Sequence, residues 1–313
     1  MTFRRTSRLS GRRRPLEGPL PIRVLAIVGL WLGTTAAQAA CPPPGLDLAG
    51  LRALKADGFE VADADRPGLA LALPDCLADS DPELRDGIAY EALSAWLRGG
   101  KLPPPLRRSL RDRLQASLEA PDAGGFAAPF AALTLAEIAR TDRIEPWMTP
   151  AERADMVARA AAWLASVSDH RGYVDGQGWR HGVAHGADWV MQLALNGQVD
   201  RVQLQRLLDA VASQVAPADG HAYIHGEPAR LARPVLLIAR RGLVDAEAWR
   251  AWFGGLPGRV GDPALAYADE GWLARRHDLA AFLSEIYLQA DRSDDERVRA
   301  LKPLAHAALD ALP

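Results

Sequence analysis

The stretch DHRGYVDGQGWRHGVAHGADWVMQLALN (residues 169–196) holds three of the seven histidines in this 313-residue chain. At about 100° per residue, His181, His185 and Asp188 fall on one stripe of a helix. The broad faces beside that stripe are apolar, which is typical of a helix packed inside a domain. The stretch therefore predicts a buried helix whose polar stripe must find partners, because each unpaired buried polar group costs about 1–3 kcal/mol.

Helix signals fill the rest of the chain. Residues 80–83 offer a cap, an early proline and an acid, and residues 149–152 form a capping box. Gly99-Gly100 marks a helix end, and no stretch shows the period-two alternation of a strand. The predicted fold is all-α: a single domain of about ten to thirteen helices, either an irregular α-solenoid (a HEAT-like α–α superhelix) or a helical bundle.

The first residues predict an exported protein. Arginines precede the apolar run VLAIVGLWLG (residues 24–33), and Ala37-Gln38-Ala39 follows it. These are the parts of a secretory signal peptide over residues 1–39, since the apolar run is too short to span a membrane. We expect a periplasmic or secreted protein. A lipoprotein at Cys41 is not expected, because the residues before it lack the leucine of a lipobox.

The expected mature chain is acidic. Removing residues 1–39 takes away seven arginines and one glutamate, so the formal charge moves from −2 to −8. A proline-rich linker, residues 40–49, then leads into one helical domain, residues 50–313. The acidity argues against nucleic acid as a partner, and no later segment has about 18 consecutive apolar residues, so no membrane span is expected after cleavage. The partner is expected to be an unknown protein or a small-molecule ligand.

The chain has two cysteines, Cys41 and Cys76. In an oxidising compartment they can form a disulfide, and we favour this over two free thiols. Two cysteines alone cannot make an all-cysteine zinc site.

Three interpretations of the histidine stripe are open. In the first, His181 and His185 bond to backbone carbonyls or to Asp188 and are structural. In the second, they line a catalytic or ligand-binding pocket, because histidine titrates near neutral pH and a carboxylate fixes its tautomer. In the third, His181, His185 and Asp188 bind a metal such as zinc, although the stretch lacks the glutamate of an HExxH motif. We expect no cofactor, with zinc as the alternative.

Two neighbouring segments bear on the pocket interpretation. Tyr173 and Trp179 lie in a glycine-rich loop at the expected helix start, where aromatic side chains can wall a cleft. A second cluster, His221, His225 and Glu227, precedes another expected helix. We expect that cluster to be an exposed cap; the alternative is that it completes the site from a neighbouring helix.

Residues 171–188, RGYVDGQGWRHGVAHGAD, resemble the signature RGYVxGKGWAHxxAHxAD of an uncharacterised bacterial family called domain of unknown function 2785. LRDGIAYEALSAWL (84–97) is similar to an early LRDxxAYxxLxxWI helix of that family, FAAPFAALTLAEI (126–138) to its FxRSFxxLxLA helix, and GEPARLARPVLLIARRG (226–242) to a later E-x-x-R-L-A segment. The resemblance covers roughly residues 50–255 and implies an all-helical fold with no established activity.

The resemblance also marks individual residues. Those that match the signature are Tyr173, Gly178, Trp179, His181, His185 and Asp188, and those that match the early helix are Arg85, Asp86 and Tyr90. The chain departs from the family pattern at Ala128-Pro129, where the family has Arg-Ser.

A charged side chain on an otherwise apolar, buried helix needs a partner of opposite charge, because an unpaired buried charge is costly. We therefore expect the catalytic candidates His181, His185 and Asp188 to cluster at one pole of the domain with Arg85 or Asp86. Tyr173 and Trp179 should lie there too. Arg85, Asp86, Tyr173 and Trp179 are the candidate ligand-binding residues.

For function, the sequence favours a helical binding or scaffold module, because α-solenoids present extended binding surfaces. The alternative is an enzyme or a small-ligand receptor, including a metal-dependent hydrolase, that uses His181, His185 and Asp188.

The leader prediction has a direct test. Protein recovered after export should lack residues 1–39 and begin near Ala40, and mass spectrometry of the intact protein measures this. An exported protein that still begins at Met1 would contradict the prediction.

Overall fold

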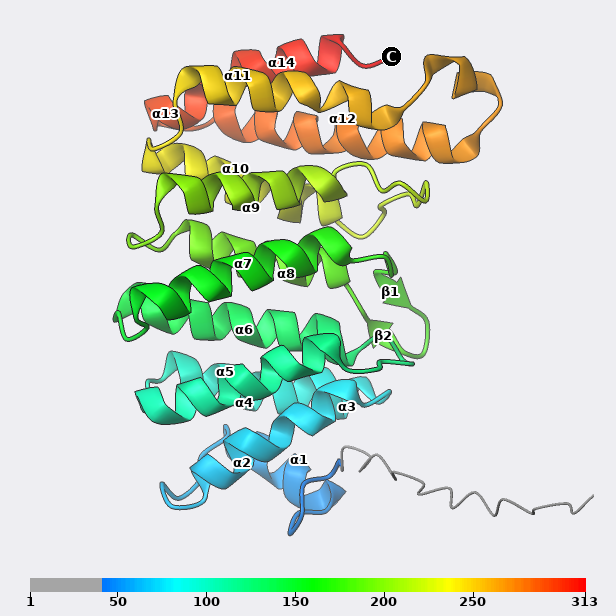
Figure 1. The fold of residues 1–313 in the computed structure, drawn as a ribbon. Coiled ribbons are helices and arrows are strands. Elements are labelled where there is room, and N and C mark those ends of the chain that lie inside the picture. Colours follow the sequence, from blue (N-terminus) through cyan, green and yellow to red (C-terminus); the bar gives the residue numbers. More distant parts are fainter. Residues whose placement is uncertain (1–40) are drawn as a thin grey trace, which may run out of the picture. The chain divides into compact units, whose positions relative to one another are not determined.

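Helices dominate the computed structural model in Figure 1, which describes residues 41–313. The predicted signal peptide lies outside the described residues. The α-helices are α1 (Leu48–Ala56), α2 (Arg66–Ala72), α3 (Pro82–Leu84), α4 (Glu91–Arg98), α5 (Pro104–Glu119), α6 (Ala127–Ile144), α7 (Pro150–Ser166), α8 (Gly182–Ala194), α9 (Arg201–Gln214), α10 (Glu227–Arg241), α11 (Ala246–Gly255), α12 (Glu270–Asp291), α13 (Glu296–Arg299) and α14 (Lys302–Asp310).

Other elements are short. They are the 3₁₀ helices η1 (Leu73–Ala78), η3 (Pro257–Val260) and η4 (Pro263–Tyr267), the π-helical segment η2 (Arg85–Tyr90), and the strands β1 (Tyr173–Val174) and β2 (Gly178–Trp179). The all-α prediction is confirmed. The predicted boundary between linker and domain, at residue 50, falls inside α1.

The sequence signals explain where the main helices begin and end. Asp81 caps α3 by accepting the N–H of Glu83, and the predicted capping box at Thr149 and Glu152 opens α7. α4 ends at Arg98, with Gly99 as its C-cap. These local bonds satisfy backbone groups that a helix end otherwise leaves unpaired.

Helices pack in chain order, as in an irregular α-solenoid (Figure 1). α6, α8, α10 and α12 form a first layer, in which α8 lies between α6 and α10, and α10 packs on α12. α7 and α9 pack against each other and also contact these helices from a second layer. The second-layer helices run in the opposite direction to those of the first layer. α6, α8, α10 and α12 therefore all begin at the same edge, which also carries β1 and β2. We call this the hairpin edge.

Glycine lets α8 sit deep between its neighbours. A Cβ on Gly186 would lie 2.7 Å from the ring of Trp163 and 2.9 Å from Leu164, both on α7. Trp189, also on α8, is completely buried. The apolar faces read from the sequence are therefore covered, and the three residues of the polar stripe, His181, His185 and Asp188, are buried as well.

A two-stranded hairpin precedes α8, although the sequence predicts no strand. Tyr173 pairs with Trp179 and Val174 with Gly178 in antiparallel register. Gly176 and Gly178 both have positive φ, at 76° and 77°, a conformation that glycine adopts without strain. Strands of two residues are too short to show an alternating pattern, which is why sequence periodicity misses them.

At the N-terminal end of the described chain, Cys41 and Cys76 form the predicted disulfide, with their Cα atoms 5.0 Å apart. The bond ties the proline-rich segment to η1. Among residues 41–313, the helices are all too short or too polar to cross a membrane.

Replacing both cysteines by alanine should lower the free energy of unfolding by roughly 3–4 kcal/mol, because the bond closes a loop of 35 residues in the unfolded chain. Urea denaturation of the oxidised protein and of the double variant measures the difference. Equal midpoints would show that the bond does not constrain the unfolded chain.

Candidate functional site

A pocket of about 580 Å³ opens at the hairpin edge, where α8 and α10 begin beside η2 and α6. Its lining mixes imidazole, aromatic, apolar and charged side chains: Asp86, Tyr90, Phe130, Leu133, Trp179, His181, His185, His225, Gly226, Ala229, Arg230 and Arg233. We call it the histidine pocket. It lies midway along the stack of helices and brings together Asp86, Trp179, His181 and His185 from the predicted set.

His181 is the N-cap of α8 and has a left-handed backbone, with φ of 55°. Such a conformation in a residue other than glycine stores strain and is concentrated at functional sites. The ring stacks on Trp179, with centroids 4.5 Å apart and planes 20° apart. Its Nε2 lies 3.3 Å from Glu227 Oε1 and 3.2 Å from the carbonyl oxygen of His225.

The partners of His181 decide where its proton lies. Both neighbours of Nε2 are acceptors, so Nε2 carries the hydrogen in the neutral ring. Nδ1 is then an acceptor, and it has no hydrogen-bond partner among residues 41–313.

His185 is fixed in the opposite tautomer. Its Nδ1 lies 3.2 Å from the carbonyl oxygen of Pro129, so Nδ1 donates and Nε2 becomes the free acceptor. The ring packs edge-on against Phe130 at 5.0 Å. Burial lowers the pKa of His185 to about 3, and the nearby positive charges of Arg230 and Arg85 act in the same direction. The imidazole is therefore neutral at physiological pH.

Glu227 supplies a buried negative charge behind His181. It is 1% exposed and accepts a hydrogen bond from the backbone N–H of His225 at 3.0 Å. Burial favours the neutral acid, but hydrogen bonds from His181 and from the amides of residues 225 and 227 outweigh it and hold the pKa of Glu227 below its usual range. The cluster expected to be an exposed cap thus contributes His225 and Glu227 to the site, and that expectation is wrong for these two residues.

Asp188 pairs with Arg230 of α10. Burial raises the pKa of Asp188, and the guanidinium of Arg230 opposes the rise. Arg85 and Asp86, the expected partners of this stripe, do not bond to Asp188, so the expectation is corrected: Arg230 is its partner.

Arg85 is completely buried next to the pocket. Its guanidinium donates to Asp86 Oδ1 at 2.6 Å, to the carbonyl oxygen of Asp79 at 3.0 Å and to that of Gln177 at 3.0 Å. It also lies 5.0 Å from the ring centroid of Phe130, which contacts His185. Arg85 therefore supports the pocket from behind, whereas Asp86 lines it. Burial raises the pKa of Asp86.

Tyr173 does not line the pocket. Its ring meets that of Trp179 edge-on at 5.1 Å, and it is 44% exposed. Tyr173 therefore holds the outer side of Trp179, which itself walls the pocket.

His221 lies elsewhere on the hairpin edge. Its ring is 5.7 Å from that of His170, and His170 Nδ1 lies 3.0 Å from Asp219 Oδ2. Across the described part of the chain, three or more His, Cys, Asp or Glu side chains never gather in an arrangement that could hold a metal ion. Within α8, the pairing of Asp188 with Arg230 separates the predicted set of three ligands into two histidines and an ion pair.

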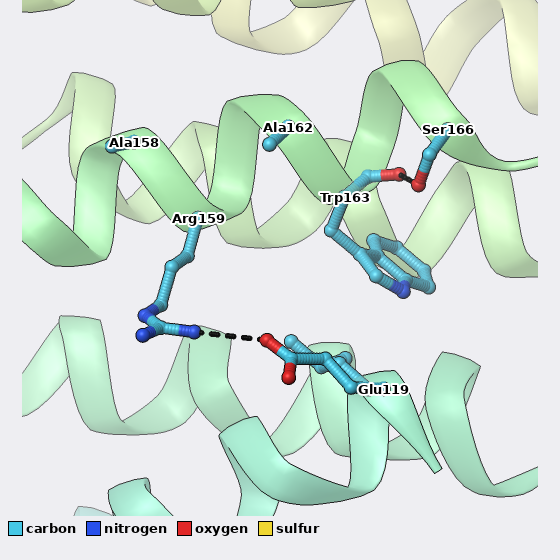
Figure 2. A pocket seen from close by; sticks show the side chains of 7 residues that line it. Glu119, Ala158, Arg159, Ala162, Trp163 and Ser166 are labelled. Carbon is cyan, nitrogen blue, oxygen red and sulfur yellow. Dashed lines mark hydrogen bonds and ion pairs between the residues drawn. The ribbon is translucent and has the colours of Figure 1, made fainter. Parts of the chain in front are cut away.

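A second pocket, of about 490 Å³, lies between α5 and α7 (Figure 2). Arg159 and Glu119 face each other across it in an ion pair of 3.2 Å, and Trp163 forms one wall. Its charged groups already satisfy one another, and it contains none of the predicted site residues. It therefore serves as a comparison site and not as the candidate.

Sequence reasoning missed Arg230 and Arg233. A usable signal was present in Glu227-Pro-Ala-Arg230, because residues three apart share one face of a helix. Ala128-Pro129, where the chain departs from the family pattern, lies at the site, since the carbonyl oxygen of Pro129 accepts the hydrogen bond from His185.

Comparisons with known proteins point to one family. A family model described as protein of unknown function (DUF2785) matches residues 115–288, more than half of the chain. The match includes the histidine block and extends past residue 255, whereas Arg85, Asp86 and Tyr90 fall outside it. No curated protein and no solved structure matches.

The lowered pKa of His185 predicts a pH dependence of stability. Between pH values of about 6.5 and 3, the unfolded chain binds a proton that the folded ring rejects, so the free energy of unfolding falls as the pH falls. The slope due to this group approaches about 1.4 kcal/mol per pH unit. His185→Asn should remove it, and urea denaturation of both proteins over this range measures the difference.

Asp278, whose pKa burial raises to about 7, has the opposite effect in both proteins and cancels in that comparison. Parallel pH profiles for the two proteins would contradict the assignment of a neutral, buried His185.

Proposed function

Because the chain belongs to the family described as protein of unknown function (DUF2785), whose description assigns no activity, we propose a function from the pocket itself. The protein is a helical binding module that holds a small polar ligand in the histidine pocket. The ligand carries hydroxyl or amino groups that donate hydrogen bonds.

One observation carries the proposal: of the three imidazoles that line the pocket, two, those of His181 and His185, each have one nitrogen already fixed by the protein. His185 donates to the carbonyl oxygen of Pro129, and His181 donates to that of His225 beside the Glu227 carboxylate, which leaves one acceptor nitrogen on each ring. A ligand must donate hydrogen bonds to these two nitrogens, because an acceptor that is buried by the ligand without a donor weakens binding. The ring centroids are 5.8 Å apart, so one small molecule can reach both.

The remaining lining fits a compact organic ligand. Phe130, Leu133 and Trp179 offer apolar contacts for a carbon skeleton, and pockets of a few hundred Å³ with a small number of placed polar groups are typical ligand sites. Arg233 has no ion pair within the described residues, so it can donate to an oxygen of the ligand.

A second candidate is an enzyme in which His181 acts as a general base. The contact between His181 Nε2 and Glu227 favours it, because a carboxylate that holds one ring nitrogen orients the other for proton transfer. The same arrangement also suits histidines that bind a metal, where the second nitrogen donates to a carboxylate or carbonyl. Zinc is therefore included in the test.

The test is isothermal titration with a panel of monosaccharides, polyols and small amines, and with zinc chloride. We expect saturable binding of at least one hydroxyl or amine compound, lost in His181→Ala and in His185→Ala. Arg159→Ala, in the pocket of Figure 2, is the control and should bind as the unmodified protein does.

Binding that persists in both histidine variants would contradict the proposal. Tight zinc binding that needs both histidines would favour the metal interpretation, and turnover of a bound compound that stops in Glu227→Gln would favour the enzyme.

A further inference from the structure

A second groove, of about 540 Å³, continues from the histidine pocket along α10 toward α13. The two share Arg233, which lines both. The floor of the groove is apolar, with Met191 of α8 and Leu236 and Leu237 of α10. Unlike the histidine pocket, it contains no histidine.

Three guanidinium groups line this groove. Arg233, Arg240 and Arg292 line it and are exposed. Arg143 of α6 donates from Nε to the side chain of Gln192 at 3.2 Å, and Gln192 follows Met191 on α8. Arg140 lies one turn before Arg143 on α6; burial lowers the pKa of Arg143, and the positive charge of Arg140 lowers it further. We call these five residues the arginine face.

None of the five has a carboxylate partner within residues 41–313, whereas arginines elsewhere commonly do. The acids nearby are largely engaged: Asp188 pairs with Arg230, Glu137 with Arg98, and Asp295 with Arg297. Asp294 is the one acid lining the groove that has no ion pair in the described chain. The face is thus positive on a chain whose overall charge is negative.

We propose that the arginine face is a docking surface for an acidic segment of another polypeptide, which lies along α10 with its apolar side chains on Met191, Leu236 and Leu237. The guanidinium group of arginine binds a carboxylate through two parallel hydrogen bonds, and arginine is common at the centres of protein interfaces. Unpaired charges of one sign also steer a partner of opposite sign and discourage others.

The apolar floor of the groove favours an acidic polypeptide over other polyanions. A sulfated polysaccharide or a nucleic acid would use the guanidinium groups and leave the floor exposed, whereas a peptide that alternates acidic and apolar residues uses both. The surface overlaps the histidine pocket at Arg233 and extends beyond it to Arg240 and Arg292, which do not line that pocket.

The test uses a fluorescein-labelled peptide of alternating glutamate and leucine, with the corresponding lysine–leucine peptide as a charge control. Fluorescence anisotropy should show saturable binding of the acidic peptide only, weaker as the salt concentration rises. The variant Arg240→Glu with Arg292→Glu should raise the Kd at least about tenfold. Arg206→Glu with Arg250→Glu makes the same change of charge at exposed arginines on α9 and α11, and should leave the Kd unchanged.

Three results would overturn the proposal: no saturable binding of the acidic peptide, an equal loss in the control variant, or tighter binding of heparin or duplex DNA than of the peptide. Binding of small ligands in the histidine pocket is measured in the same variants and should not change, so the two proposals can fail separately.

Discussion

The structure of the site depends on one buried cation. Arg85 has no exposed surface, and its guanidinium is satisfied by one carboxylate, Asp86, and by backbone carbonyls of Asp79 and Gln177, with the rings of Phe126 and Phe130 beside it. A buried charge is tolerated only when partners converge on it. Since those partners come from the end of η1, from η2, from the hairpin and from α6, satisfying Arg85 fixes the hairpin against the body of the domain and brings Trp179 over His181.

The polar contacts of the histidine pocket lie at the hairpin edge, which Arg85 holds in place. The helices of the first layer all begin there, so their caps and the loops before them lie along one edge. His181 caps α8 and contacts Glu227 at the start of α10, while His185, one turn later, contacts Pro129 in the first turn of α6. Each imidazole thus spans two helices, which explains how the histidines can both stabilise the packing and present a nitrogen to a ligand. The structural and pocket interpretations of the stripe are compatible with each other.

The sequence predicted the fold well because helix signals are local. The capping box at Thr149 and the glycine after α4 depend on residues within one turn, and the stripe on α8 depends on a fixed angle per residue. The partners of the stripe depend on tertiary contacts between distant segments, and here prediction was mixed. Asp86 lines the pocket, as the matched segments implied. Asp188, however, pairs with Arg230, and Glu227 is buried, because α10 packs against α8. The hairpin was missed since its strands are only two residues long.

Hydrogen exchange of Arg85→Met tests most directly whether Arg85 holds the hairpin in place. Methionine fills similar space without donating hydrogen bonds, so the contact with Gln177 is lost while apolar packing on Phe126 and Phe130 is kept. We expect backbone amides of residues 173–181 to exchange much faster than in the unmodified protein, with those of α12 unchanged. Unchanged exchange across the hairpin, or a uniform increase across the whole domain, would contradict the central role of Arg85.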